Sequence, residues 1–188
     1  MEFWYVLIGI GFLILLLPYV RLFFKRLNCA CKINKLCRKK GYKKYSTHLF
    51  WFLGNQYGMN CDLYIETANE IFAIKLFGVT RRLSVLILKQ KNAYSIRKKS
   101  VLPTHGGGIR TPIDSRQKPI PTYNFRYKYK EIWETKIPRR ILLVNPISSG
   151  IKYQPSHGSE VSVDLGDIVN GMEIHSLSYL LERLENTL

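Results

Sequence analysis

Residues 60–77 read NCDLYIETANEIFAIKLF and hold two apolar runs on either side of a short polar stretch. Ala68 and Asn69 can form a two-residue turn, so we predict that the two runs pair as antiparallel strands. This pairing places Asp62 directly opposite Lys75. The chemistry of the chain therefore depends on whether these two residues belong to a metal-dependent site or form an ion pair across a hairpin.

The ion-pair interpretation needs only the hairpin. Opposite charges that face each other across antiparallel strands stabilise a sheet by roughly 0.2–1 kcal/mol. On this interpretation Asp62 and Lys75 contribute to folding and take no part in a reaction.

The same stretch is also part of a longer pattern. A basic helix ending in LCRKKGYKKY (residues 36–45) precedes a strand, the aspartate lies on a second strand, and the lysine lies on a third. Over about residues 33–77 this order resembles the core of the restriction-endonuclease-like superfamily. The resemblance implies that Asp62, together with an acidic residue two positions before the lysine, would hold Mg²⁺. It also implies that Lys75 would position water and the scissile phosphate.

The second carboxylate of that pattern is missing, because Ala73 occupies its position. Glu66 shares a face with Asp62 but lies four residues, about 13 Å, further along the strand. Glu70 projects from the opposite face to Lys75. One carboxylate beside an ammonium group is a poor site for a hard divalent ion. We therefore expect no metal and no cofactor, and we interpret the domain as non-enzymatic.

The charge of the chain indicates a polyanionic partner. A length of 188 residues allows one domain of ordinary size after an apolar N-terminus. Lys and Arg number 29 against 13 Asp and Glu, which gives a formal net charge of +16. Such a balance is typical of proteins that contact nucleic acid or an anionic lipid surface.

The N-terminus predicts a membrane anchor. Residues 3–20 read FWYVLIGIGFLILLLPYV and carry no charge. As a helix they would reach about 27 Å, close to the thickness of the bilayer hydrocarbon. We predict one transmembrane helix over residues 1–24. Basic residues follow this run and none precedes it, so the positive-inside rule places the N-terminus outside the cell membrane and the remaining chain in the cytoplasm.

Residues 25–44 form a basic juxtamembrane segment. Ile33, Leu36 and Cys37 recur at helical spacing within it, which predicts a short amphipathic helix near the inner leaflet. Anionic lipid head groups would then be contacted by Lys39, Lys40, Lys43 and Lys44. The other interpretation is a solvated run that serves only as a topology signal.

Residues 45–188 predict a cytoplasmic α+β domain with a mainly antiparallel sheet. Short apolar runs separated by turn residues indicate strands of one sheet, at 48–53, 61–67, 71–77, 83–88 and 93–96. Residues 139–147 indicate a buried strand, and residues 162–169 a hairpin around Leu165 and Gly166. Residues 100–122, with several prolines and the stretch THGGG, read as an irregular loop.

The C-terminus predicts a helix that packs on the sheet. Ser176 is a candidate N-cap. An apolar stripe follows it at helical spacing: Leu177, Leu180, Leu181, Leu184 and Leu188.

The stretch YNFRYKYK (residues 123–130) alternates aromatic and polar residues. On a strand the aromatic rings lie on one face and the cations on the other. Exposed rings beside Arg126, Lys128 and Lys130 would bind single-stranded nucleic acid. A half-buried strand, with lysines that protect a sheet edge, is the other interpretation.

The cysteines indicate a reducing compartment, because they crowd into one part of the chain and lack the spread of a disulfide framework. Cys29, Cys31 and Cys37, with Cys61 further along, leave a zinc-stabilised juxtamembrane segment as a minor alternative. The four histidines show no ligand spacing, and no nucleotide-binding or hydrolase motif occurs.

Together these patterns predict a single-pass membrane protein whose cytoplasmic α+β domain is an interaction or scaffolding module for an unidentified protein partner. The alternative is a degenerate nuclease-like domain that binds nucleic acid at the membrane.

Overall fold

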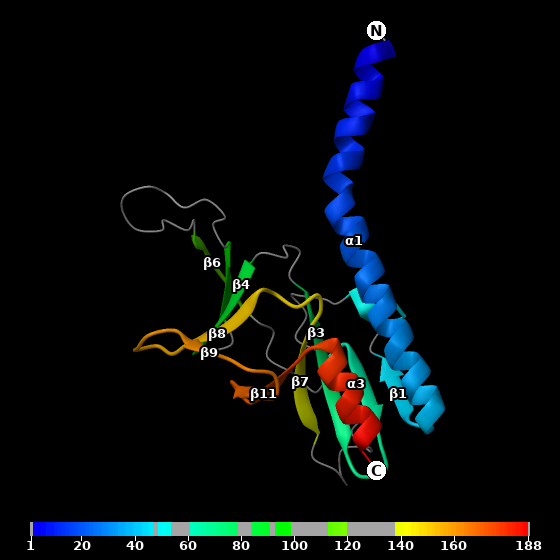
Figure 1. Ribbon diagram of the computed structural model, residues 1–188, viewed down its shortest axis with the longest axis vertical. Coiled ribbons are helices and arrows are strands. Elements are labelled where there is room, and N and C mark those ends of the chain that lie inside the picture. The colour runs from blue at the N-terminus through cyan, green and yellow to red at the C-terminus, as the bar shows by residue number, and fades with distance from the viewer. Residues whose placement is uncertain are drawn as a thin grey trace.

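The computed structural model describes residues 2–46, 49–53, 61–78, 84–90, 93–98, 113–119 and 138–187. In the N-terminal helix the side chains are described from Leu16 onward, except at position 18. Figure 1 shows a long N-terminal helix beside a domain made mostly of strands. The prediction of mixed α+β structure with a C-terminal helix is confirmed.

The first element is one continuous helix, α1, from Glu2 to Lys40. Its N-terminal half extends past the rest of the chain, and its C-terminal half lies along the domain (Figure 1). The helix ends at Gly41, whose φ of +70° is a left-handed conformation that glycine adopts at little cost. Residues 25–44 thus comprise the second half of α1 and the start of β1 (Lys43–Ser46). The short amphipathic helix expected in this segment is instead part of a long one.

The first sheet has the strand order β1-β2-β3-β7-β11-β10. β1, β2 and β3 form an antiparallel meander, whereas β7 pairs parallel with β3, and β11 pairs parallel with β7. β10 adds to β11 in the antiparallel direction. The bounds of these strands are β2 (Leu63–Glu66), β3 (Ile71–Phe77), β7 (Arg139–Val144), β10 (Ile168–Val169) and β11 (Met172–His175).

The second sheet has the order β6-β5-β4-β8-β9. Parallel neighbouring strands need long connections between them. The connection from β3 to β7 contains β4, β5 and β6, and the connection from β7 to β11 contains β8 and β9. β4 and β8 pair parallel and the other neighbours antiparallel. The bounds are β4 (Ser84–Lys89), β5 (Ala93–Lys98), β6 (Ile113–Pro119), β8 (Gly150–Gln154) and β9 (Val161–Ser162).

The first sheet is covered on both faces. Figure 1 shows α1 and α3 (Leu177–Asn186) against one face, where their apolar side chains join those of the sheet in the main core. The opposite face shares a second core with the second sheet. Alternation along β7 produces this division, because Ile141 and Leu143 belong to the main core while Leu142 and Val144 belong to the second. Burial on both faces explains why β3 is apolar along most of its length.

The predicted hairpin is confirmed in its register. Leu63 pairs with Ile74, Tyr64 with Ala73, and Glu66 with Ile71. Thr67 and Glu70 close the turn, because the Thr67 backbone N–H donates to the Glu70 carbonyl at 2.9 Å. The strands predicted at 83–88 and 93–96 also form an antiparallel pair, and residues 139–144 form a buried strand.

Four details of the sequence-based fold are wrong. The strands belong to two sheets, because the parallel pairing of β3 with β7 turns the intervening chain out of the first sheet. Residues 51–53 form the 3₁₀ helix η1 (Trp51–Leu53) in place of a strand. The predicted loop 100–122 contains β6, which pairs with β5. Residues 162–169 do form a turn at Leu165 and Gly166, but the flanking strands β9 and β10 join different sheets.

The C-terminal helix is confirmed together with its cap. The Ser176 Oγ accepts a hydrogen bond from the Tyr179 backbone N–H at 3.2 Å. Leu180 and Leu184 are fully buried, while Leu177 and Leu181 pack at the edge of the main core.

The side chains of α1 are described only from Leu16 onward. Within the described residues, none of the helices is both long enough and apolar enough to cross a membrane.

Candidate functional site

The structure brings Asp62 and Lys75 together, as the sequence predicts. The Lys75 Nζ lies 3.4 Å from the Asp62 Oδ1, and the Leu76 backbone N–H donates to the Asp62 Oδ2 at 2.8 Å. Asp62 comes directly before β2, and Lys75 alternates with Ile74 and Leu76 along β3. The pair therefore lies on the face of the sheet opposite to α1 and α3.

The burial of this pair differs from the expectation for a surface hairpin. The Asp62 and Lys75 side chains are only 2% and 3% exposed. The range of 0.2–1 kcal/mol considered for an exposed cross-strand pair does not apply here, because removing one partner of a buried pair strands a charge away from water. The pair is a structural element of considerable energetic weight.

The surroundings of the pair do not form a carboxylate site. Ala73 packs with Cys61, Tyr64 and Tyr45 in a small apolar cluster. Nowhere among the described residues do three or more His, Cys, Asp or Glu side chains gather closely enough to hold a metal ion. Among the described residues, Ala73 thus occupies the position where the resemblance to a metal-dependent nuclease expects a second acidic ligand.

Arg26 is a buried cation near the pair that the sequence did not single out. It lies on α1, is only 6% exposed, and donates from Nη1 to the Leu53 carbonyl. Its Nε and Nη2 have no hydrogen-bond partner among the described residues. Burial lowers the pKa of Arg26, and the negative charge of Asp62 opposes that shift. Arg26 thus joins η1 to α1 at the edge of the main core.

The cysteines of α1 do not converge on one point. Cys29 and Cys37 are buried in the main core, whereas Cys31 is exposed. Burial raises the pKa of the Cys29 thiol to about 12 and also raises that of Cys37, so both remain protonated at neutral pH. Among the described residues no three potential metal ligands gather around these thiols, so the structure adds no support to the zinc alternative.

The four lysines expected at the lipid surface lie at the C-terminal end of α1 and the start of β1. Lys39 forms an ion pair with the Glu185 carboxylate at 3.4 Å, and Lys40 donates to the Glu185 carbonyl at 2.7 Å. Lys44 donates to the Asn34 side chain. Lys43 is exposed and stands opposite Glu66 in the β1–β2 register. Two of these lysines thus contact the C-terminal end of α3.

The stretch YNFRYKYK, with Arg126, Lys128 and Lys130, lies outside the described residues, as does the THGGG stretch at 104–108.

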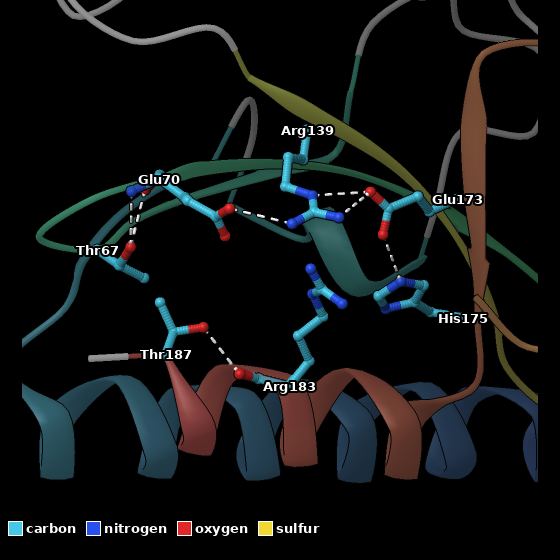
Figure 2. A network of polar contacts seen from close by, with 7 residues as sticks. All are labelled: Thr67, Glu70, Arg139, Glu173, His175, Arg183 and Thr187. Atoms are coloured by element: carbon cyan, nitrogen blue, oxygen red, sulfur yellow. Dashed lines mark hydrogen bonds and ion pairs between the residues drawn. The ribbon is translucent and has the colours of Figure 1, made fainter. Parts of the chain in front are cut away.

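A polar network that the sequence did not predict lies where β2, β3, β7, β11 and α3 meet. Arg139, at the start of β7, links two carboxylates: its Nη1 donates to the Glu70 Oε1 at 3.0 Å, and its Nε donates to the Glu173 Oε1 at 2.7 Å. Figure 2 shows this guanidinium between the two acidic side chains, with Arg183 of α3 extending toward the network. Burial acts to lower the pKa of Arg139, but hydrogen bonds to Glu173 and Glu70 raise it overall.

His175 extends the network into the protein interior. It is fully buried, and its Nε2 lies 3.2 Å from the Glu173 Oε2. Within the part of the chain that the structure describes, its Nδ1 has no hydrogen-bond partner, and its ring packs edge-on against Tyr179 with centroids 4.8 Å apart. Burial lowers the pKa of His175, although Glu173 opposes the shift. We assign the neutral tautomer in which Nε2–H donates to Glu173, since that leaves a bare nitrogen and no buried donor at Nδ1.

An open groove of about 300 Å³ lies beside this network. Its lining comes from the β2–β3 turn and from the outer side of α3: Glu70, Tyr179, Glu182, Arg183, Asn186 and Thr187. Arg183 is partly exposed and forms no ion pair among the described residues. Charges of both signs around an open groove suit a polar peptide surface better than an enclosed substrate.

Sequence patterns could not have identified this network. Glu70, Arg139 and Glu173 lie apart in the chain, in the turn before β3, at the start of β7 and within β11. Only the parallel pairing of β3, β7 and β11 brings the three together. A comparison with protein-family models, curated proteins and solved structures finds no match for the chain.

Proposed function

We propose that the chain is a membrane-anchored protein whose folded domain is a non-enzymatic interaction module on the cytoplasmic side. The observation that carries the proposal is the continuity of α1. Its backbone is helical from Glu2 to Lys40, its first half has an uncharged sequence over residues 3–20, and its second half belongs to the domain core. A helix of 18 apolar residues reaches about 27 Å, which suits the bilayer hydrocarbon.

The continuity of α1 also connects the domain rigidly to the proposed anchor. Cys29, Ile33 and Cys37 are almost fully buried against the sheet, so α1 joins the domain without a flexible linker. An anchor built in this way holds the domain in a set orientation to the membrane. The groove beside Arg183 lies near the end of α1 that is farther from the apolar run, and there it is accessible to a protein partner.

The location is tested with a reporter fused after Leu188 and with carbonate washing of isolated membranes. We expect a cytoplasmic reporter and a chain that stays with the membrane. Leu13→Arg and Leu16→Arg together should release it, because each arginine adds about 2.5–3.5 kcal/mol to the cost of insertion. Ile168→Arg, at an exposed position on β10, is the control. A reporter accessible from outside the cell contradicts the proposed orientation.

The interaction role is tested by crosslinking in mild detergent. Arg183→Glu reverses the charge of the groove and should abolish the crosslinked partner, whereas Lys89→Glu on the second sheet should leave it unchanged. Equal crosslinking by both variants would place the partner elsewhere on the molecule.

A nuclease-like domain that binds nucleic acid at the membrane is the second candidate. It is supported by the order α1, β1, β2, β3 with Asp62 opposite Lys75, and by the formal charge of +16. Because one acidic ligand is absent, we expect the full-length protein to cut neither DNA nor RNA with Mg²⁺ or Mn²⁺. Residual nucleic-acid binding should be independent of sequence and should fall steeply with salt. Metal-dependent cleavage that Asp62→Asn abolishes, with the fold intact, would make this candidate the correct one.

A further inference from the structure

An apolar surface lies beside α1 at the level where its uncharged run ends. We define the collar as Tyr19, Val20, Phe23 and Phe24 of α1 together with Leu49, Phe50 and Leu53 in and before η1. Leu49 is 81% exposed and Phe50 55%, while Tyr19 and Phe24 on the helix are 66% and 61% exposed. Large apolar side chains gathered on one exposed surface mark a contact with another apolar phase.

The two parts of the collar have a fixed relative position, because η1 packs against α1. Trp51 is buried in the main core, and the Phe52 ring packs edge-on against Phe23 with centroids 5.9 Å apart. Arg26 donates from its Nη1 to the Leu53 carbonyl. These contacts fix the level of η1 along the helix at residues 23–26.

Between the two elements lies an apolar groove of about 380 Å³. Its lining combines the helix with the last residue of η1: Tyr19, Val20, Leu22, Phe23, Arg26 and Leu53. The groove is open and its lining is mostly apolar, which suits a hydrocarbon chain.

The position of the collar identifies its occupant. Phe23 lies three residues after Val20, only about 4.5 Å further along the helix. The headgroup region extends about 5–7 Å beyond the hydrocarbon on each side of a bilayer. Aromatic residues are enriched at this level, and Arg21 and Lys25, both exposed on the same turns of α1, suit acidic head groups.

We propose that the exposed side chains of Leu49, Phe50 and Leu53 insert into the cytoplasmic leaflet of an acidic phospholipid bilayer, beside α1, and that an acyl chain occupies the groove between η1 and the helix. The inference rests on the proposed membrane location of α1 and adds a second lipid contact from a separate part of the chain. The domain then contacts the bilayer through both α1 and η1. These two contacts restrict the rotation of the domain about the helix axis and its distance from the membrane.

The test uses nitroxide labels on the full-length chain in a Cys31→Ser background, where the remaining cysteines are buried. Single labels are placed at Leu49→Cys, at Leu17→Cys in the apolar run, and at Ile168→Cys, which is 71% exposed on β10. The protein is reconstituted in vesicles of phosphatidylcholine with a minority of phosphatidylglycerol. Collision with oxygen, which concentrates in the bilayer, is compared with collision with a water-soluble nickel chelate.

We expect oxygen to dominate at Leu17 and at Leu49, and the nickel chelate to dominate at Ile168. Oxygen dominance at Leu17 with nickel dominance at Leu49 would overturn the inference and leave the anchor standing. Nickel dominance at both positions would overturn the anchor as well. A Leu49 label shielded from both reagents would show that protein covers the collar, and it too would overturn the inference.

Discussion

The Asp62–Lys75 pair shows how burial changes the meaning of a charge pair. The two residues face each other as the hairpin register requires, but their side chains lie almost wholly out of water. An exposed pair of this kind contributes little, whereas a buried pair is costly to break from one side and inexpensive to replace as a whole.

Lys75→Met and Asp62→Asn should each destabilise the protein by about 3–5 kcal/mol, because each leaves one side of the buried pair without its partner. The double variant should lose less than the sum of the two, since it leaves no charge unpaired. Urea denaturation of the full-length chain in detergent, followed by tryptophan fluorescence, measures this. Additive losses would show that the two side chains do not depend on each other.

His175 makes the stability of the fold depend on pH. Its pKa is lowered in the folded chain, first by burial, so below about pH 6.5 the unfolded chain binds a proton that the folded chain does not. Stability is therefore fully present above that pH and falls as pH drops through the window between the unfolded and folded pKa values. The charged groups that influence His175 are Glu173, Arg139 and Arg183.

His175→Gln should flatten the decline of the urea midpoint below about pH 6.5, because a glutamine does not titrate. His157→Gln, at an exposed position, serves as the control and should keep the wild-type decline. Parallel curves for His175→Gln and the wild-type protein would assign the decline to other groups.

Among the elements, α3 connects the polar network, the groove and the end of α1. Ser176 caps its first turn, and the Tyr42 hydroxyl donates to the Leu184 and Thr187 carbonyls at 3.0 and 2.7 Å at its other end. Lys40 satisfies a further terminal carbonyl, which also suits the negative end of the helix dipole. Both ends of this short helix therefore depend on side chains outside it.

Ser176→Ala should destabilise the protein by about 0.5–2 kcal/mol, because the Tyr179 backbone N–H loses its acceptor. Hydrogen exchange should become faster in the first turn of α3 and stay unchanged in β3. Ser159→Ala, at an exposed position with no structural contact of this kind, is the matched control. Unchanged exchange at Tyr179 would mean that water replaces the cap without loss.

At the scale of the whole molecule, the length of α1 separates two groups of cations. Arg21 and Lys25 lie near the end of the uncharged run, and Lys39 and Lys40 lie at the C-terminal end of the helix. Lys39 lies fifteen residues after Phe24, about 22 Å along the helix axis. At a tilt of 40°, near the upper end for transmembrane helices, Lys39 would still lie about 17 Å from Phe24 along the membrane normal. In the proposed anchored orientation, Lys39 and Lys40 at the end of α1 thus lie farther from the headgroups than the length of about 10 Å over which charges are screened at 0.1 M salt, so we expect them to contribute little to lipid binding.

We therefore expect Arg21→Gln with Lys25→Gln to reduce the acidic lipid that co-purifies with the full-length chain, because the proposed anchor places these cations at the headgroup level. Replacing the four lysines by glutamine should change it little. Mass spectrometry of the bound phosphatidylglycerol and phosphatidylcholine measures the ratio. Loss of acidic lipid in the lysine variant would show that α1 lies close to the bilayer plane and that the lysines do contact head groups.

The sequence by itself determined what depends on neighbours along the chain. A two-residue turn set the register of β2 and β3, an alternating apolar pattern indicated the β4–β5 pair, and a serine before a leucine stripe marked the start of α3. Each of these follows from the period of side chains along a strand or helix, which is a local property.

Only the tertiary structure decided how these parts combine. The parallel pairing of β3 with β7 joins residues 67 positions apart, such as Phe72 and Arg139. Together with the parallel pairing of β11 with β7, it brings Glu70, Arg139 and Glu173 into one network. Ile33, Leu36 and Cys37 show the same limit: their helical spacing identifies an apolar stripe, but a sheet and a lipid leaflet satisfy such a stripe equally well. The sheet occupies it here because β2, β3 and β7 present a matching apolar face, and that face exists only once the chain has folded.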